Sequence, residues 1–80
     1  GTLLGKGSLP IVTLEHMLGI DIEYDDSIDS VGGLGMEKLG DLPKEGQKIE
    51  FAAFDVVIKR MSGPKIVLVK VYPKGGDVRE

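Results

Sequence analysis

The sequence predicts an α+β domain, in which a short strand and two helices precede a three-stranded antiparallel meander. Three observations favour this class. Apolar residues recur at helical spacing in the first half of the chain, whereas polar and apolar residues alternate in the second half. The 80 residues, 41% of them hydrophobic, suffice for one small core and are too apolar for intrinsic disorder.

A short strand and a short amphipathic helix are expected first. The strand covers residues 2–4, and glycines follow it in a turn-rich segment. The helix covers residues 11–18, because the apolar residues of this segment share one helical face. We expect Ser8 to cap the helix, Pro10 to occupy its first turn and Gly19 to end it.

A second helix is expected over residues 31–39, with Ser30 as its N-cap and Gly40 at its end. Three glycines lie inside it, and each costs about 1 kcal/mol relative to alanine in a helix. Tertiary packing must therefore hold this helix, and its glycines would let another backbone come very close. The alternative is that free N–H groups of Gly32-Gly33-Leu34-Gly35, at the helix N-terminus, receive an anion.

Three strands are expected from residue 47 onward. Polar and apolar side chains alternate over residues 47–51 and 54–58, and the phase of the alternation changes at Ala52-Ala53. A bend or bulge belongs there, in a connection wider than a primed two-residue turn, because alanine disfavours positive φ. After a turn at 62–64, residues 66–72 are apolar on both faces, as in a central strand. Such a strand needs cover on both sides, which leaves open a homodimer paired along a sheet edge.

The domain is expected to cover residues 1–73, followed by a flexible tail over residues 74–80. The chain starts without Met and within sequence that looks structured, so we expect it to be a fragment of a longer protein. It shows no signal-peptide pattern, and no apolar run approaches the roughly 18–20 residues that span a bilayer. We therefore expect that this fragment does not insert into a membrane.

The charge of the chain is unevenly distributed. Residues 1–55 hold 4 of the 10 basic and 11 of the 13 acidic side chains, whereas residues 56–80 hold the other 6 and 2. The acidic part argues against nucleic-acid binding, which requires a basic face to displace phosphate counterions. The lack of cysteine excludes thiolate chemistry, and the single histidine, His16, is expected to face solvent with no neighbour in sequence to orient it. We therefore expect that the domain is not an enzyme.

The segment between the two helices is strongly acidic. Asp21, Glu23, Asp25 and Asp26 offer the hard oxygen ligands that Mg²⁺ and Ca²⁺ prefer, and Asp29 follows them. The segment lacks the glycine and the final glutamate of the calcium-loop template. Two interpretations remain open: a solvated acidic loop, or a weak divalent-cation site formed by the first four carboxylates.

Several motifs occur in a fixed order along the chain. The most specific of them is Val31-Gly32-Gly33-Leu34, followed by Leu39-Gly40-x-Leu42-Pro43-x-x-Gly46. The weaker motifs are Leu9-Pro10, Leu18-Gly19-Ile20-Asp21 and Phe54-Asp55-Val56. Together they resemble the transporter-associated domain of the CorC/HlyC family, and the resemblance covers nearly the whole chain.

The resemblance implies a role and a location. Domains of this family lie at the C-terminal end of bacterial proteins, after a pair of CBS domains and often after a membrane-embedded domain. These proteins are associated with magnesium and cobalt efflux or are called hemolysin-like. The implied function is that of a non-catalytic regulatory domain on the cytoplasmic side of the inner membrane, with the CBS-pair and membrane domains of the parent protein as its partners. The fold is grouped with FAD-binding domains, so the alternative is a domain that binds a nucleotide, a flavin (FAD) or a divalent cation.

Overall fold

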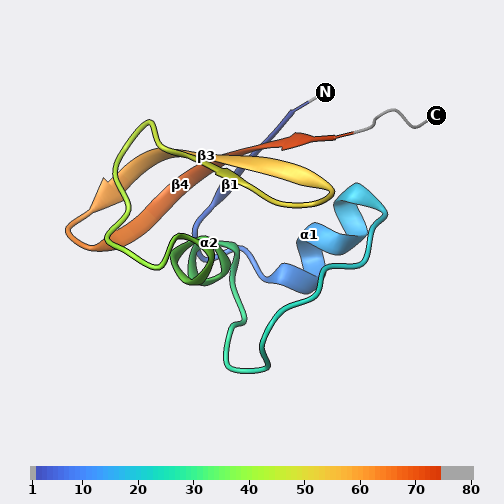
Figure 1. Cartoon of the computed structure of the whole chain (residues 1–80). Coiled ribbons are helices and arrows are strands. Elements are labelled where there is room, and N and C mark those ends of the chain that lie inside the picture. Colours follow the sequence, from blue (N-terminus) through green and yellow to red (C-terminus); the bar gives the residue numbers. More distant parts are fainter. Residues whose placement is uncertain (1, 75–80) are drawn as a thin grey trace.

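The computed structural model describes residues 2–74, in which two helices pack beneath a four-stranded antiparallel sheet (Figure 1). The elements in chain order are β1 (Leu3–Lys6), α1 (Ile11–Leu18), α2 (Val31–Leu39), β2 (Lys48–Glu50), β3 (Phe54–Ser62) and β4 (Lys65–Pro73). This order confirms the predicted α+β class and the meander at the end of the chain. No helix in the described range has the length and apolar character needed to cross a membrane.

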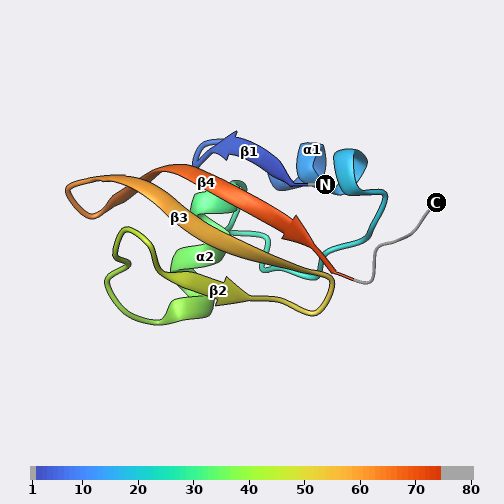
Figure 2. The same cartoon turned by 90° about the horizontal axis from the view of Figure 1, so that it is seen from above.

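The first strand joins the sheet beside the last one. The strand order is β1-β4-β3-β2, which is visible in Figure 2, where the sheet is viewed from the side opposite the helices. Strand β4 is therefore central, as predicted, and both of its edges are covered within the chain. Strand β1 runs to Lys6, two residues beyond its predicted end, and Gly7 prolongs the pairing because its N–H donates to the Val67 carbonyl at 2.8 Å.

Helix α1 starts differently from the prediction. Its N-cap is Pro10, whose backbone is extended, and no side chain caps the helix, so the expected roles of Ser8 and Pro10 are wrong. Backbone pairing explains the difference: Pro10 forms a bridge with Ser30, and the Ile11 N–H donates to the Asp29 carbonyl at 3.2 Å. The segment before α2 thus provides a hydrogen-bond acceptor for the first N–H group of α1. Gly19 ends the helix with φ of 68°, as predicted.

Helix α2 matches its prediction at both ends. The Ser30 hydroxyl accepts the Gly33 N–H at 3.1 Å, and Gly40 ends the helix with φ of 70°. Its glycines are sites of close approach. A Cβ at Gly32 would lie 2.8 Å from the Gly7 carbonyl oxygen, and a Cβ at Gly7 would collide with the backbone carbonyl of Ile66. The backbone of Gly7 is therefore clamped between β4 and the first turn of α2, so tertiary packing holds this glycine-rich helix.

The β3–β4 pairing contains an irregularity that the sequence pattern did not reveal. The register shifts around Arg60, where Lys59 and Val67 are each an extra residue of their strand. The buried positions change parity at the same place, so that residues on both sides of the irregularity face the helices. The β2–β3 connection has no non-glycine residue with positive φ, as expected from its alanines.

One apolar core lies between the sheet and the helices. Its fully buried members come from five of the six elements: Ile11, Leu14, Val31, Leu34, Ile49, Phe54, Val56, Ile58, Ile66, Val69 and Val71. The predicted tail begins at Lys74, whose N–H donates to the Ala53 carbonyl at 2.9 Å; residues 75–80 of that tail lie outside the described residues.

Candidate functional site: the open face of the sheet

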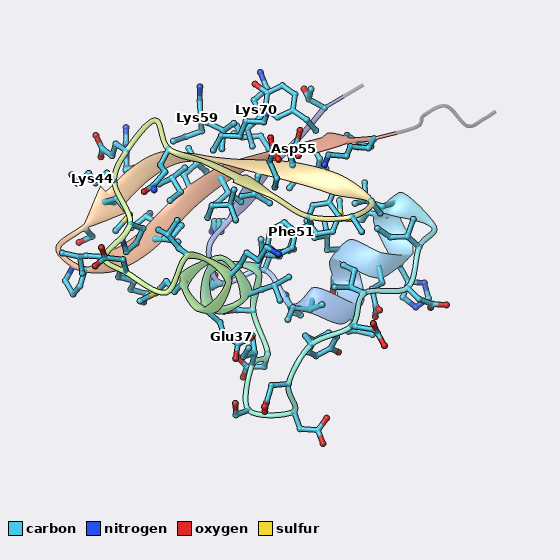
Figure 3. The ribbon with its side chains drawn as sticks, in the orientation of Figure 1. Glu37, Lys44, Phe51, Asp55, Lys59 and Lys70 are labelled. Carbon is cyan, nitrogen blue, oxygen red and sulfur yellow. The ribbon has the colours of Figure 1, made fainter. Side chains whose placement is uncertain are left out.

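One face of the sheet carries the helices, and the other face is bare within the described residues (Figure 1). The strand register identifies the side chains on this bare face, since Leu4 lies opposite Lys70, Lys70 opposite Val57, and Val57 opposite Lys48. Figure 3 shows Asp55, Lys59 and Lys70 pointing away from the helices. We call the following set the open face: Leu4, Lys6, Lys48, Glu50, Asp55, Val57, Lys59, Arg60, Leu68, Lys70 and Tyr72.

The open face is partly apolar. Val57, Leu68 and Tyr72 are half-buried, and Leu4 is 60% exposed. A hollow of about 210 Å³ lies among Lys48, Asp55, Val57 and Tyr72. A bare sheet face with apolar side chains and a hollow is suited to contact with another surface.

Both carboxylates of the open face are paired with lysines. The Asp55 side chain is 15% exposed, with Lys48 Nζ 3.5 Å from its Oδ2 and Lys74 Nζ 3.1 Å from its Oδ1. The Lys74 contact lacks hydrogen-bond geometry and is therefore a charge contact; the Lys74 ammonium donates its hydrogen bond to the Phe51 carbonyl at 2.7 Å. Lys48 Nζ also lies 3.8 Å from Glu50. Because the side chains of Lys48 and Lys74 reach solvent, each pair contributes at most about 1 kcal/mol.

Three other lysines of the open face have no such partner. Within residues 2–74, no carboxylate lies at ion-pairing distance from Lys6, Lys59 or Lys70. The Lys70 ammonium lies 5.6 Å from the centre of the Tyr72 ring, in a cation–π contact. The open face therefore carries net positive charge although the chain as a whole is acidic.

The acidic segment lies on the other side of the molecule. Asp21, Glu23, Asp25 and Asp26 are all exposed in the connection between α1 and α2, which forms the lower loop of Figure 1. The structure does not bring three His, Asp or Glu side chains of the described residues together in an arrangement that could hold a metal ion. The divalent-cation site formed by these four carboxylates stays a prediction.

Asp25 has a specific local environment within this segment. Its Oδ1 accepts the backbone N–H and the hydroxyl of Ser27, both at 2.9 Å, and these bonds lower the pKa of Asp25 below its ordinary value. We expect Ser27→Ala to raise the pKa of Asp25 part of the way back, because only the backbone bond remains. A carboxyl NMR titration measures the change, and Ser27→Thr, which keeps the hydroxyl, is the control; an equal pKa in all three proteins contradicts the prediction.

The sign of the resulting pH dependence follows from the direction of the shift. A carboxyl group whose pKa is lowered by folding stabilises the folded state at pH values above the pKa that the group has in the unfolded chain. The contribution of Asp25 is therefore present at neutral pH and is lost as the pH falls through its folded pKa.

The N-terminus of α2 does not offer free donors for an anion. The N–H groups of Val31 and Gly32 donate to the carbonyls of Leu9 and Gly7 at 2.9 and 2.8 Å. The N–H groups of Gly33 and Leu34 donate to the side chain and the carbonyl of Ser30. An anion would have to displace these bonds, so the structure favours close packing as the role of the glycines. His16 is exposed on α1, as predicted.

Sequence reasoning missed the open face as a functional surface. The signal was present in the parity of the strands, because residues 55 and 57 and residues 68, 70 and 72 alternate with buried positions. Strand parity alone does not show whether a helix or another strand covers a face. The structure was needed to show that both helices pack on the same side.

Comparison with known proteins places this fold in a family. The family model of the transporter associated domain, CorC_HlyC, matches residues 1–75, and no curated protein matches the chain. A CorC_HlyC domain from Haemophilus ducreyi superposes with a TM-score of 0.83 at 20% identity, over 92% of this chain and 89% of that chain.

Two further solved structures are similar. The transporter associated domain of a CBS domain protein from Porphyromonas gingivalis has a TM-score of 0.79 at 23% identity, over 91% of this chain and 88% of that chain. The associated region of a putative Mg²⁺ and Co²⁺ transporter (CorC) from Neisseria meningitidis MC58 has a TM-score of 0.81 at 18% identity, over 90% and 88%. With a family model matched over almost its whole length, the chain belongs to the CorC/HlyC family of transporter-associated domains.

Proposed function

We propose that this chain is a non-catalytic regulatory domain of a bacterial CBS-domain protein, and that it acts through contacts with neighbouring domains. The parent would be a magnesium/cobalt transport or hemolysin-like protein, and the partners would be its CBS-pair and membrane domains on the cytoplasmic side of the inner membrane. The family assignment supports this proposal, as do the names of similar structures that include a CBS domain protein and a Mg²⁺ and Co²⁺ transporter.

The observation that carries the proposal is the open face. An antiparallel sheet that packs a core on one side commonly presents polar residues to water on the other. Here Leu4, Val57, Leu68 and Tyr72 lie among the lysines, over all strands except β2. Interfaces between domains of one protein likewise combine polar groups with a limited apolar area. The open face therefore suits a domain–domain contact.

The proposal predicts that a charge placed in the open face disturbs regulation. Val57 lies at the centre of this face and is half-buried, so Val57→Glu would put a carboxylate into the contact. We expect it to change the cation transport of the full-length parent roughly 5- to 150-fold, the usual range of coupling between sites. Cation flux in membrane vesicles measures the effect.

The matched control is Val12→Glu, the same substitution at a residue of α1 that is 54% exposed. We expect transport by this variant to equal that of the wild type. Circular dichroism of both isolated variants confirms that each is folded. Wild-type transport by folded Val57→Glu, or an equal change in both variants, contradicts the proposed function.

A further inference from the structure

We propose that the partner segment bound by the open face is an acidic stretch of protein that inserts one apolar or aromatic side chain into the hollow among Lys48, Asp55, Val57 and Tyr72. This inference rests on the proposed function, because it names the chemistry of the partner that the open face receives. Three features of the open face lead to it: its unpaired charge, the position of its hollow and the distribution of its two carboxylates.

The unpaired charge specifies an acidic partner. Lys6, Lys59 and Lys70 have no carboxylate at ion-pairing distance within residues 2–74, while Lys48 and Lys74 are already held by Asp55. A neutral or basic surface that covered the three lysines would leave buried, unpaired charges. Carboxylates on the partner would pair with them and would also steer the encounter.

The hollow specifies one inserted side chain. Its walls come from three neighbouring strands, with Val57 between Lys48 and Lys70 in one row and Tyr72 beside Asp55 in the next. The apolar surfaces of Val57 and Tyr72 favour an apolar or aromatic side chain, and a volume of about 210 Å³ has room for one. Pockets of this kind at protein interfaces receive the anchor residues that dominate binding.

The same features favour a protein over an anionic membrane surface. Glu50 and Asp55 lie on the open face, and both would be repelled by a uniformly negative bilayer. A protein segment can place a carboxylate over Lys59 and Lys70 and an apolar group over the hollow, so that each part of the face meets its complement. The experiment must therefore distinguish binding to an acidic protein segment from binding to an anionic lipid surface.

The experiment titrates the chain, labelled with ¹⁵N, with three probes and follows its amide signals by NMR. The probes are a copolymer of glutamate and tyrosine, polyglutamate, and vesicles of phosphatidylglycerol. We expect the copolymer to shift the signals of Val57, Lys70 and Tyr72 and to bind more tightly than polyglutamate, because only the copolymer fills the hollow. We expect the affinity to fall as salt is added.

A charge-matched pair of variants locates the binding. Lys59→Glu with Lys70→Glu should weaken copolymer binding at least tenfold. The control, Lys38→Glu with Val12→Glu and Met17→Glu, makes the same change in net charge at exposed residues of the two helices and should leave binding at the wild-type level. Unchanged amide spectra outside the substituted sites show that both variants are folded.

Several results would overturn the inference. These are an absence of open-face shifts with the copolymer, an equal loss of binding in the open-face variant and the helix variant, or binding to the vesicles in preference to the copolymer. The two proposals fail separately. Wild-type transport by folded Val57→Glu contradicts the proposed function. If Val57→Glu alters transport but Lys59→Glu with Lys70→Glu neither alters transport nor weakens copolymer binding, the open face remains the docking surface and the acidic partner is ruled out.

Discussion

Gly32→Ala should destabilise the domain by at least about 3 kcal/mol, the upper end of the usual cost of overpacking. The new methyl group would lie 2.8 Å from the carbonyl oxygen of Gly7, and the same oxygen accepts the Gly32 N–H at 2.8 Å. The obstacle is backbone, so no side-chain rotation relieves it. Gly7 itself cannot retreat, because it lies against the backbone of Ile66 in β4. Urea denaturation measures the loss of stability.

Gly33→Ala is the matched control for that prediction, since it adds the same methyl group one residue later in α2. Its nearest neighbours are side-chain atoms, Ser30 Oγ at 3.3 Å and Ile28 Cγ2 at 3.4 Å. Alanine is favoured over glycine in a helix by about 1 kcal/mol, which offsets the tight contact. Similar losses of stability in the two variants would contradict the clamping of α2 onto Gly7.

Phe54→Ala should remove a large part of the stability of the domain. Phe54 is 1% exposed in the core, and loss of such a side chain costs about 3–5 kcal/mol. A domain of this size is stable by roughly 4–12 kcal/mol, so the variant should unfold at a much lower urea concentration or be unfolded without urea.

Phe51→Ala provides the comparison for Phe54→Ala. The two rings stack with centroids 4.7 Å apart, but Phe51 is only half-buried, at the end of the sheet. Its loss should therefore cost clearly less. An equal or greater loss of stability in Phe51→Ala would contradict the placement of Phe54, and not Phe51, at the centre of the core.

The parts of the fold that were predicted correctly depend on local sequence. Ser30 and Gly40 define the two ends of α2 because capping and left-handed termination act within one helical turn. The alternation of residues 54–58 predicts a strand because neighbouring side chains of a strand point to opposite faces. The need for tertiary packing of α2 also followed from sequence, because its glycines make it a poor isolated helix.

The parts that were not predicted depend on segments distant in sequence. The start of α1 is set by the pairing of Pro10 with Ser30, and the extra residues Lys59 and Val67 are defined only by the register of β3 against β4. The open face, too, depends on segments that are distant in sequence. Its lysines are dispersed along the sequence, and they form one surface only because four strands align them.

Figure 3 also shows how the uneven charge of the sequence becomes a difference between two sides of the molecule. Lys59 and Lys70 point from the sheet to one side, whereas Glu37 points from α2 to the other, where the acidic loop also lies. A net charge of −3 therefore conceals a basic surface opposite an acidic one. This arrangement would orient the domain against a partner of uneven charge.

Site-specific photo-cross-linking in the full-length parent protein tests the open face as the docking surface most directly. A photoreactive phenylalanine analogue is placed at Tyr72 on the open face or at Val12 on α1, on the helix side of the sheet. We expect the analogue at Tyr72 to cross-link to the CBS-pair or membrane domain and the analogue at Val12 to give no cross-link to either. Cross-links from Val12 without any from Tyr72 would show that the helix side, and not the open face, makes the contact.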